Sequence, residues 1–168
     1  VTNVETITLG NADTNVTSVD TLVADGATLT VDGSALTGTN NLTWDGSAEL
    51  DGSFQITGSG QGDNITGGAD ADTIIGGTGA DTITGGAGVD KITGAAGVDV
   101  LDGAAGDDIF SYASSAEFAA SNAVIDTVTG GGGNDTIQVT GAITIAATNT
   151  MARVNTVETL AAATQSGS

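Results

Sequence analysis

Aspartates recur every nine residues between Gly58 and Ser111, and this spacing is the feature of the chain best suited to chemistry. Six consecutive blocks read GSGQGDNIT, GGADADTII, GGTGADTIT, GGAGVDKIT, GAAGVDVLD and GAAGDDIFS. The sixth residue of every block is an aspartate: Asp63, Asp72, Asp81, Asp90, Asp99 and Asp108. A fixed short period stacks equivalent residues of successive units, so these carboxylates must lie in columns. Stacked carboxylates repel one another unless a cation lies between them.

The same blocks predict the elements that position the carboxylates. A large apolar residue follows each aspartate by two places: Ile65, Ile74, Ile83, Ile92, Leu101 and Phe110. Glycines allow a tight loop, so two blocks make one coil of strand, loop, strand and loop. Loops two blocks apart then stack at about 4.8 Å, the spacing of parallel strands. The expected pairs are Asp63 with Asp81, Asp72 with Asp90, Asp81 with Asp99, and Asp90 with Asp108.

Loops of this kind offer only carboxylate and carbonyl oxygens. Six or more oxygen ligands in a flexible cage favour Ca²⁺ over Mg²⁺, and the absence of Cys and His disfavours zinc. A single Gly-Asp loop would be only a solvated turn, but a seventh copy at residues 130–138 strengthens the metal interpretation. We expect about four or more Ca²⁺ ions. The candidate ligating residues are Asp63, Asp72, Asp81, Asp90, Asp99, Asp108, Asp135, Gly76, Gly77, Gly79, Gly85, Gly86, Gly88, Gly97 and Gly106.

The array resembles the hemolysin-type calcium-binding nonapeptide repeats of secreted RTX proteins, whose pattern is GGxGxDxUx. Units 76–84, 85–93 and 130–138 fit that pattern in full. Four units depart from it at glycine positions, which hold Ser59 and Gln61, Asp70, Ala95, and Ala104. Residues 103–139 also resemble, more weakly, the region that follows the repeats in RTX proteases.

The resemblance implies an all-β fold: a right-handed parallel β-roll or β-solenoid with calcium bound between loops. Further β coils or caps and one short helix would flank it. It also implies export by type I secretion and folding outside the cell. Extracellular calcium modules bind with dissociation constants of about 10⁻⁴ to 10⁻³ M. Without ions the stacked acids oppose collapse, so we expect calcium binding and folding to be coupled.

Composition limits the partners of the chain. Its 168 residues, enough for one domain, include 21 acidic and two basic residues, for a net charge of −19. Two cations cannot form a phosphate-binding surface, so we expect no nucleic-acid partner. No apolar run is long enough to span a bilayer, so we expect no membrane insertion. Aromatic residues are only 3% of the chain, which predicts a thin core. Because the chain begins at Val1, we expect it to be processed or part of a longer protein.

Three segments differ in pattern. In residues 1–57, short alternating runs between Asp-Gly turns predict strands, and the turns suit either hairpins or solenoid corners; the neighbouring repeat favours corners. Residues 58–111 are the nonapeptide array. In residues 112–168 the capping-box sequence at Ser114 predicts a short helix over 115–121. Strands are expected near 124–128, 136–139 and 143–145.

The two ends of the chain resemble each other. Residues 1–7 read VTNVETI and residues 154–160 read VNTVETL. This similarity is consistent with a module that recurs in tandem or docks end to end, or with chance similarity between two β-rich strands. The possible partners are therefore calcium ions and the chain itself or neighbouring modules.

No catalytic constellation stands out. Without His or Cys the usual base of a nucleophilic triad is missing, so we expect no enzyme. A glycosidase-type carboxylate pair stays open only because aspartate is abundant. Lys91 and Arg153 are expected to be surface or interface charges. Trp44 is expected to pack on a solenoid face or cap, with sugar stacking as the less favoured reading.

Three functions compete. The first is a secreted, calcium-binding structural module of a bacterial surface protein, such as an S-layer, a filament or an adhesin. The second is the C-terminal secretion and folding domain of an exported protease or lipase, favoured by the similarity at 103–139. The third, ice binding by a threonine ladder, is disfavoured because the outward positions of the array run Thr66, Ile75, Thr84, Thr93, Asp102 and Ser111.

Overall fold

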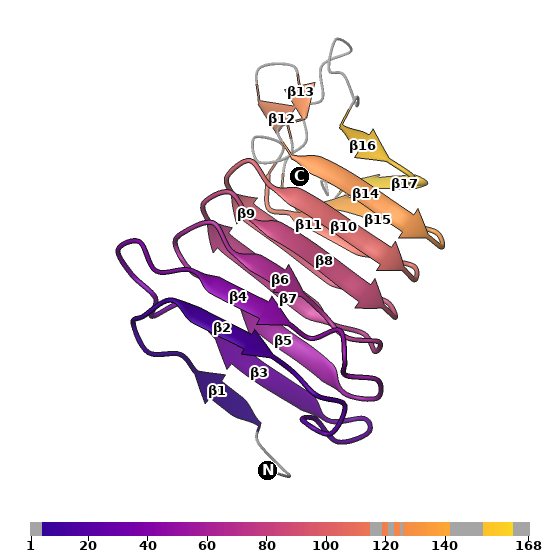
Figure 1. The fold of residues 1–168 in the computed structure, drawn as a ribbon. Coiled ribbons are helices and arrows are strands. Elements are labelled where there is room, and N and C mark those ends of the chain that lie inside the picture. Colours follow the sequence, from indigo (N-terminus) through magenta and orange to yellow (C-terminus); the bar gives the residue numbers. More distant parts are fainter. Residues whose placement is uncertain (1–4, 115–118, 121–122, 125, 142–152, 163–168) are drawn as a thin grey trace, which may run out of the picture.

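Two parallel β-sheets face each other across a thin core (Figure 1). The computed structural model describes residues 5–114, 119–120, 123–124, 126–141 and 153–162. The eight-stranded sheet comprises, in spatial order, β1 (Thr6–Thr8), β3 (Thr28–Asp32), β5 (Ser53–Thr57), β7 (Thr73–Thr78), β9 (Lys91–Ala96), β11 (Ile109–Tyr112), β15 (Thr136–Val139) and β17 (Thr159–Ala162). The seven-stranded sheet comprises β16 (Val154–Asn155), β14 (Thr127–Gly132), β10 (Val100–Ala105), β8 (Thr82–Ala87), β6 (Asn64–Thr66), β4 (Leu42–Asp45) and β2 (Thr14–Thr17).

Successive strands alternate between the two sheets, so each coil gives one strand to each. The apolar residues of the repeats point inward and stack in register. One ladder runs through the eight-stranded sheet as Ile56, Ile74, Ile92, Phe110 and Ile137. The facing ladder runs as Trp44, Ile65, Ile83, Leu101 and Val128. All ten side chains are buried. This architecture confirms the predicted parallel β-roll.

After the first pairing, in which β1 and β3 are offset by 24 residues, the coils shorten along the chain and then lengthen once. Hydrogen-bonded partners on neighbouring coils are 28, 25 and 21 residues apart in the N-terminal coils. They are 18 residues apart within the array, as two nonapeptides require. The separation rises to 27 after the array. An extra segment containing β12 (Ala119–Ala120) and β13 (Ala123–Val124) occupies that long connection.

The structure decides one local question that the sequence left open and corrects one prediction. The Asp-Gly turns of the first 57 residues are solenoid corners, because β1, β3 and β5 pair in parallel. Among the described residues, only β12 and β13 pair antiparallel. The helix expected over 115–121 is wrong at Ala119–Ala120, which form β12 because they pair with β13; the rest of that stretch lies outside the described residues.

The strands expected near 124–128 and 136–139 are present as β13, β14 and β15. The strand expected at 143–145 lies outside the described residues. Within the described part of the chain, no helix is long and apolar enough to cross a membrane.

Candidate metal centre

All four predicted aspartate pairs are present, and a hydrogen bond from a backbone N–H group joins the two residues of each pair. In each pair the main-chain N–H of the earlier aspartate donates a hydrogen bond to Oδ1 of the aspartate 18 residues later. The N···O distances are 2.8 Å for Asp63–Asp81, 2.8 Å for Asp72–Asp90, 2.9 Å for Asp81–Asp99 and 2.8 Å for Asp90–Asp108. One carboxylate oxygen of each later aspartate is therefore fixed by the coil before it.

Two further pairs extend the stack beyond the array. Asp108 N–H donates to Asp135 Oδ1 and Asp99 N–H donates to Asp126 Oδ1, both at 2.9 Å. The first column is Asp72, Asp90, Asp108 and Asp135; the second column is Asp63, Asp81, Asp99 and Asp126. Asp126 was not expected from the sequence because it lies beyond the contiguous array and no glycine-rich segment precedes it, although it keeps the nine-residue frame. Its local signal is the apolar Val128 two places later, as in every repeat.

The second oxygen of most column aspartates is buried without a partner. Oδ2 of Asp81, Asp90, Asp99, Asp108, Asp126 and Asp135 has no hydrogen-bond donor among the described residues. These six side chains are at most 1% exposed. A buried polar atom without a partner costs about 1–3 kcal/mol, and more when it is charged. A positively charged ligand would satisfy these six atoms in two columns.

A glycine leaves space beside the orphaned oxygen of each of the five repeat aspartates. A Cβ placed on Gly76 would collide with Asp81 Oδ2 and lie 2.9 Å from the Gly94 carbonyl oxygen. A Cβ on Gly85 would likewise meet Asp90 Oδ2 and lie 2.8 Å from the Gly103 carbonyl oxygen. A carboxylate oxygen and a carbonyl from the next coil thus border one small space. An all-oxygen environment of this kind suits a hard cation such as Ca²⁺.

The family comparison agrees with this geometry. Residues 57–92, 75–110 and 122–139 match the model of the RTX calcium-binding nonapeptide repeat (4 copies), over less than half of the chain. The chain contains RTX calcium-binding repeats. Such repeats bind Ca²⁺, and the β-roll that they form is a structural, calcium-binding fold of secreted proteins. No curated protein and no solved structure matches the chain.

The remaining predicted glycines shape the RTX loops. Gly77, Gly79, Gly86, Gly88 and Gly106 have φ between 102° and 148°, a region that side chains disfavour. Gly97 lies directly against the Gly79 carbonyl, and Gly106 also lies against the Gly88 carbonyl, with no room for a Cβ at either position. In the degenerate units, Ala95 and Ala104 take left-handed φ values of 72° and 71° where the pattern has glycine.

Burial raises the pKa of the column carboxylates. The pKa of Asp81 and Asp90 rises to about 7, and that of Asp72 to about 6. Desolvation is the main cause, and neighbouring carboxylates add to it, while the hydrogen bonds from the preceding coil oppose it. The pKa values of Asp99 and Asp108 are raised for the same main reason. Calcium would reverse this shift because it stabilises the charged form.

In the first two RTX units, protein groups already donate hydrogen bonds to the column carboxylates. Ser59 stands at a glycine position; its hydroxyl donates to Asp63 Oδ1 at 2.8 Å and its N–H donates to Oδ2 at 2.5 Å. Gly68 N–H donates to Asp72 Oδ2 at 2.6 Å in the second unit. The two columns therefore start with carboxylates whose oxygens already have donors.

The other ends of the columns carry different residues. Glu158 Oε2 accepts a hydrogen bond from Asp135 N–H at 2.8 Å and so takes the next place in the first column. At the end of the second column, burial raises the pKa of Asp126 to about 6. A hydrogen bond from Tyr112 and the charge of Arg153 oppose that rise. The positive charge of Arg153 thus acts on Asp126, the last carboxylate of the second column.

Proposed function

We propose that the column aspartates are the calcium ligands of this chain, together with glycine carbonyls of the neighbouring coil. The orphaned oxygens that support this assignment belong to Asp81, Asp90, Asp99, Asp108, Asp126 and Asp135. Asp63 and Asp72 would bind more weakly, because donors from Ser59 and Gly68 already occupy their Oδ2 atoms. The bound ions supply positive charge that lets adjacent coils approach.

The role that follows is structural. We assign the chain to the extracellular part of a bacterial surface protein (an S-layer, a filament or an adhesin) that folds on calcium after type I secretion. The observation that supports this role is the pair of buried carboxylate columns. Because these carboxylates repel one another without a cation, the fold requires a calcium-rich medium. The three segments would divide the work: residues 1–57 as a capping solenoid, 58–111 as the calcium-dependent roll, and 112–168 as the C-terminal segment with the repeat at 130–138.

The two ends of the solenoid support end-to-end association with a second copy. Strands β1 and β17 lie at opposite edges of the eight-stranded sheet, and β2 and β16 at opposite edges of the other (Figure 1). Glu5 and Glu158 both precede an edge strand of the same sheet, at the column position. Leu160 in β17 is 45% exposed, so the apolar ladder ends uncovered. A second copy could continue both sheets by parallel pairing.

Light scattering and electron microscopy of the purified chain, with and without Ca²⁺, test this role. Ordered head-to-tail polymers that appear only with calcium are the expected result. The matched variant is Leu160→Lys, which places a charge at the exposed edge without touching a column, and should stay monomeric. A wild-type chain that is monomeric in both conditions would contradict the assembly role and favour the secretion-domain function, which the similarity at 103–139 supports.

A further inference from the structure

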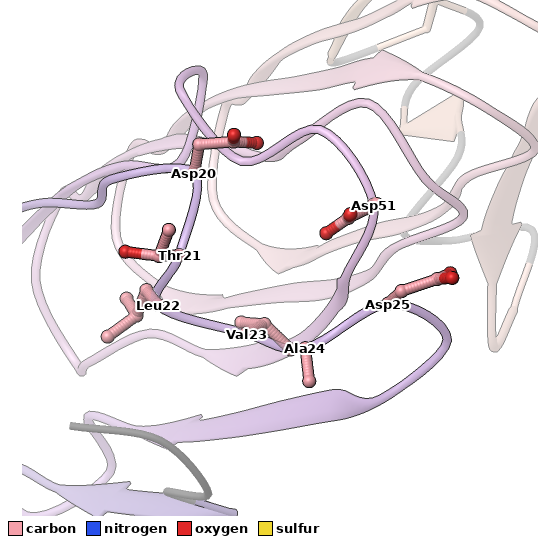
Figure 2. Close-up of a pocket in the computed structure, with 7 residues that line it drawn as sticks. All are labelled: Asp20, Thr21, Leu22, Val23, Ala24, Asp25 and Asp51. Atoms are coloured by element: carbon pink, nitrogen blue, oxygen red, sulfur yellow. The ribbon is translucent and has the colours of Figure 1, made fainter.

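A second group of acids lies outside the RTX repeats, at the corner between the first coils. Asp20 belongs to the loop between β2 and β3, and Glu49 and Asp51 belong to the loop between β4 and β5. One carboxylate oxygen from each lies within 4.8 Å of the others. Figure 2 shows Asp20 and Asp51 on facing loops with their carboxylates turned toward the space between them, whereas the Asp25 carboxylate points away.

Glu49 distinguishes this group from an ordinary acidic surface cluster. Its side chain is 0% exposed. Its Oε2 accepts a hydrogen bond from Val23 N–H at 3.0 Å, but Oε1 has no partner among the described residues. The two basic residues of the chain, Lys91 and Arg153, lie in β9 and beside β16, several coils away. A buried carboxylate oxygen with no donor and no nearby cation needs a ligand from outside the chain.

The two loops are held together independently of any ion. Gly26 N–H donates to the Asp51 carbonyl at 2.9 Å. Gly52 packs against Val23, and a Cβ on this glycine would come within 2.6 Å of Val23 Cγ1. Glu49 N–H donates to the Gly46 carbonyl at 2.9 Å, which fixes the turn that carries the carboxylate. The acids are therefore brought together by the backbone before a ligand arrives.

We propose that Asp20, Glu49 and Asp51 bind one calcium ion at this corner. Three carboxylates from two loops form a hard, all-oxygen donor set. Asp20 and Asp51 are exposed, so water can fill the remaining coordination positions. The flexible number of ligands favours Ca²⁺ over Mg²⁺, which requires a compact octahedron.

The site extends calcium dependence to coils that contain no RTX repeat. An ion here would link the long β2–β3 connection to the next coil. It would also provide a partner for the buried Oε1 of Glu49. This inference does not rest on the assembly role or on the RTX loops, because none of its three residues belongs to a column.

Calcium stoichiometry of the full-length chain tests the site. Bound Ca²⁺ is counted by equilibrium dialysis for the wild type, Glu49→Gln, the double variant Asp20→Asn/Asp51→Asn, and Asp25→Asn as a control from the same loop. Glutamine retains an oxygen acceptor for Val23 N–H. We expect Glu49→Gln and the double variant to bind one ion fewer per chain, and the control to match the wild type. Hydrogen exchange should accelerate in residues 18–27 of both site variants and stay unchanged in the array.

Two results would overturn the site: an unchanged ion count in the double variant, or the same loss in Asp25→Asn. If Glu49→Gln fails to fold, the double variant decides, since its two residues are exposed. A failure of the RTX assignment has a different signature, because calcium would then fail to protect residues 64–111 of the wild type from exchange.

Discussion

The N-terminal coils and the RTX array share one fold but are stabilised in different ways. The N-terminal coils are long and contain the largest core side chain, Trp44, which makes an edge-to-face contact with Phe54 at 5.3 Å between ring centroids. The array coils have 18 residues and place one isoleucine in most strands. At the column positions the N-terminal coils carry the apolar Leu42 and Phe54, which pair with the first aspartates. Along one continuous solenoid, the column positions therefore change from buried apolar residues to buried aspartates.

Aspartate itself has opposite roles in the two regions. Asp32 and Asp45 lie at Asp-Gly corners, where hydrogen bonds from Ser34 and Ser47 lower their pKa values. The column aspartates are buried, and their pKa values are raised. A corner aspartate thus stabilises its turn while ionised. A column aspartate destabilises the roll while ionised, unless a cation is bound.

Removal of calcium should separate the two regions most strongly. In excess chelator at neutral pH we expect the amides of residues 64–111 to exchange like those of an unfolded chain, because the carboxylates then repel. Trp44 fluorescence should stay blue-shifted, because its contacts are apolar. Hydrogen exchange with mass spectrometry measures the first effect. Array protection that persists in chelator would disprove the coupling.

Acid should partly replace calcium in the array. The folded-state pKa values of Asp81 and Asp90 are about 7 against an ordinary 3.8, so the calcium-free folded chain binds more protons than the unfolded chain between these values. Its free energy of unfolding should therefore rise as the pH falls from 7 toward 4. Circular dichroism in chelator measures the gain in β-structure. The calcium-saturated chain should show the reverse trend, since protons compete with the ion, and the same trend in both would contradict the shifts.

The core of the N-terminal coils should tolerate truncation less well than the array. Trp44→Ala should lower the free energy of unfolding by about 3–5 kcal/mol, as expected for deletion of a buried aromatic side chain. Ile83→Ala, the matched truncation in the same ladder, should cost about 2–5 kcal/mol. Urea unfolding in saturating calcium measures both. Equal costs would show that the two cores are equivalent.

Neutralising one column aspartate should raise the free energy of unfolding without calcium and lower it with calcium. In Asp90→Asn the amide oxygen can still accept from Asp72 N–H, while the charge near Asp72 and Asp108 is lost. Without calcium, the variant should be more stable by about 1–3 kcal/mol, the cost of an unsatisfied buried group. With calcium it should bind fewer ions and be less stable than the wild type. Asp45→Asn at a corner is the control, and its loss of stability should be the same in both states, because the hydrogen bonds from Ser47 do not depend on calcium.

The smallest effect concerns the alanines in left-handed loops. Ala95→Gly should stabilise the array by about 1 kcal/mol, because the wild-type residue has φ 72°. The adjacent Ala96→Gly should lower stability by about 0.5–1 kcal/mol, since there glycine only adds chain entropy. Thermal unfolding in calcium compares the two. If both substitutions changed stability in the same direction, backbone strain at Ala95 would not be the cause of the difference expected here.

The array was predictable because nine residues set both the carboxylate column and the apolar ladder. All four expected pairs are therefore formed. Asp126 escaped prediction because a longer connection shifts it by an extra nonapeptide, and a connection length is not encoded in the column pattern. The Asp-Gly corners were ambiguous because the same dipeptide suits a hairpin. Only hydrogen bonds between residues more than 20 positions apart show that these turns are corners of a coil.

The Asp20, Glu49 and Asp51 group could not be found from spacing. Glu49 and Asp51 are close in sequence, but Asp20 lies almost thirty residues earlier, in a corner of different length. The burial of Glu49 also follows from how two loops pack, through Val23 and Gly52. No local pattern predicts contacts of this kind.

The rise per coil gives the ionised roll the character of a polyelectrolyte. Each coil advances about 4.8 Å and adds one carboxylate to each of two columns, which is roughly one negative charge per 2.4 Å of axis. Duplex DNA carries one per about 1.7 Å and condenses a counterion atmosphere. A roll that folds before calcium arrives should do the same with sodium or potassium, so the apparent affinity for calcium should fall steeply as monovalent salt increases.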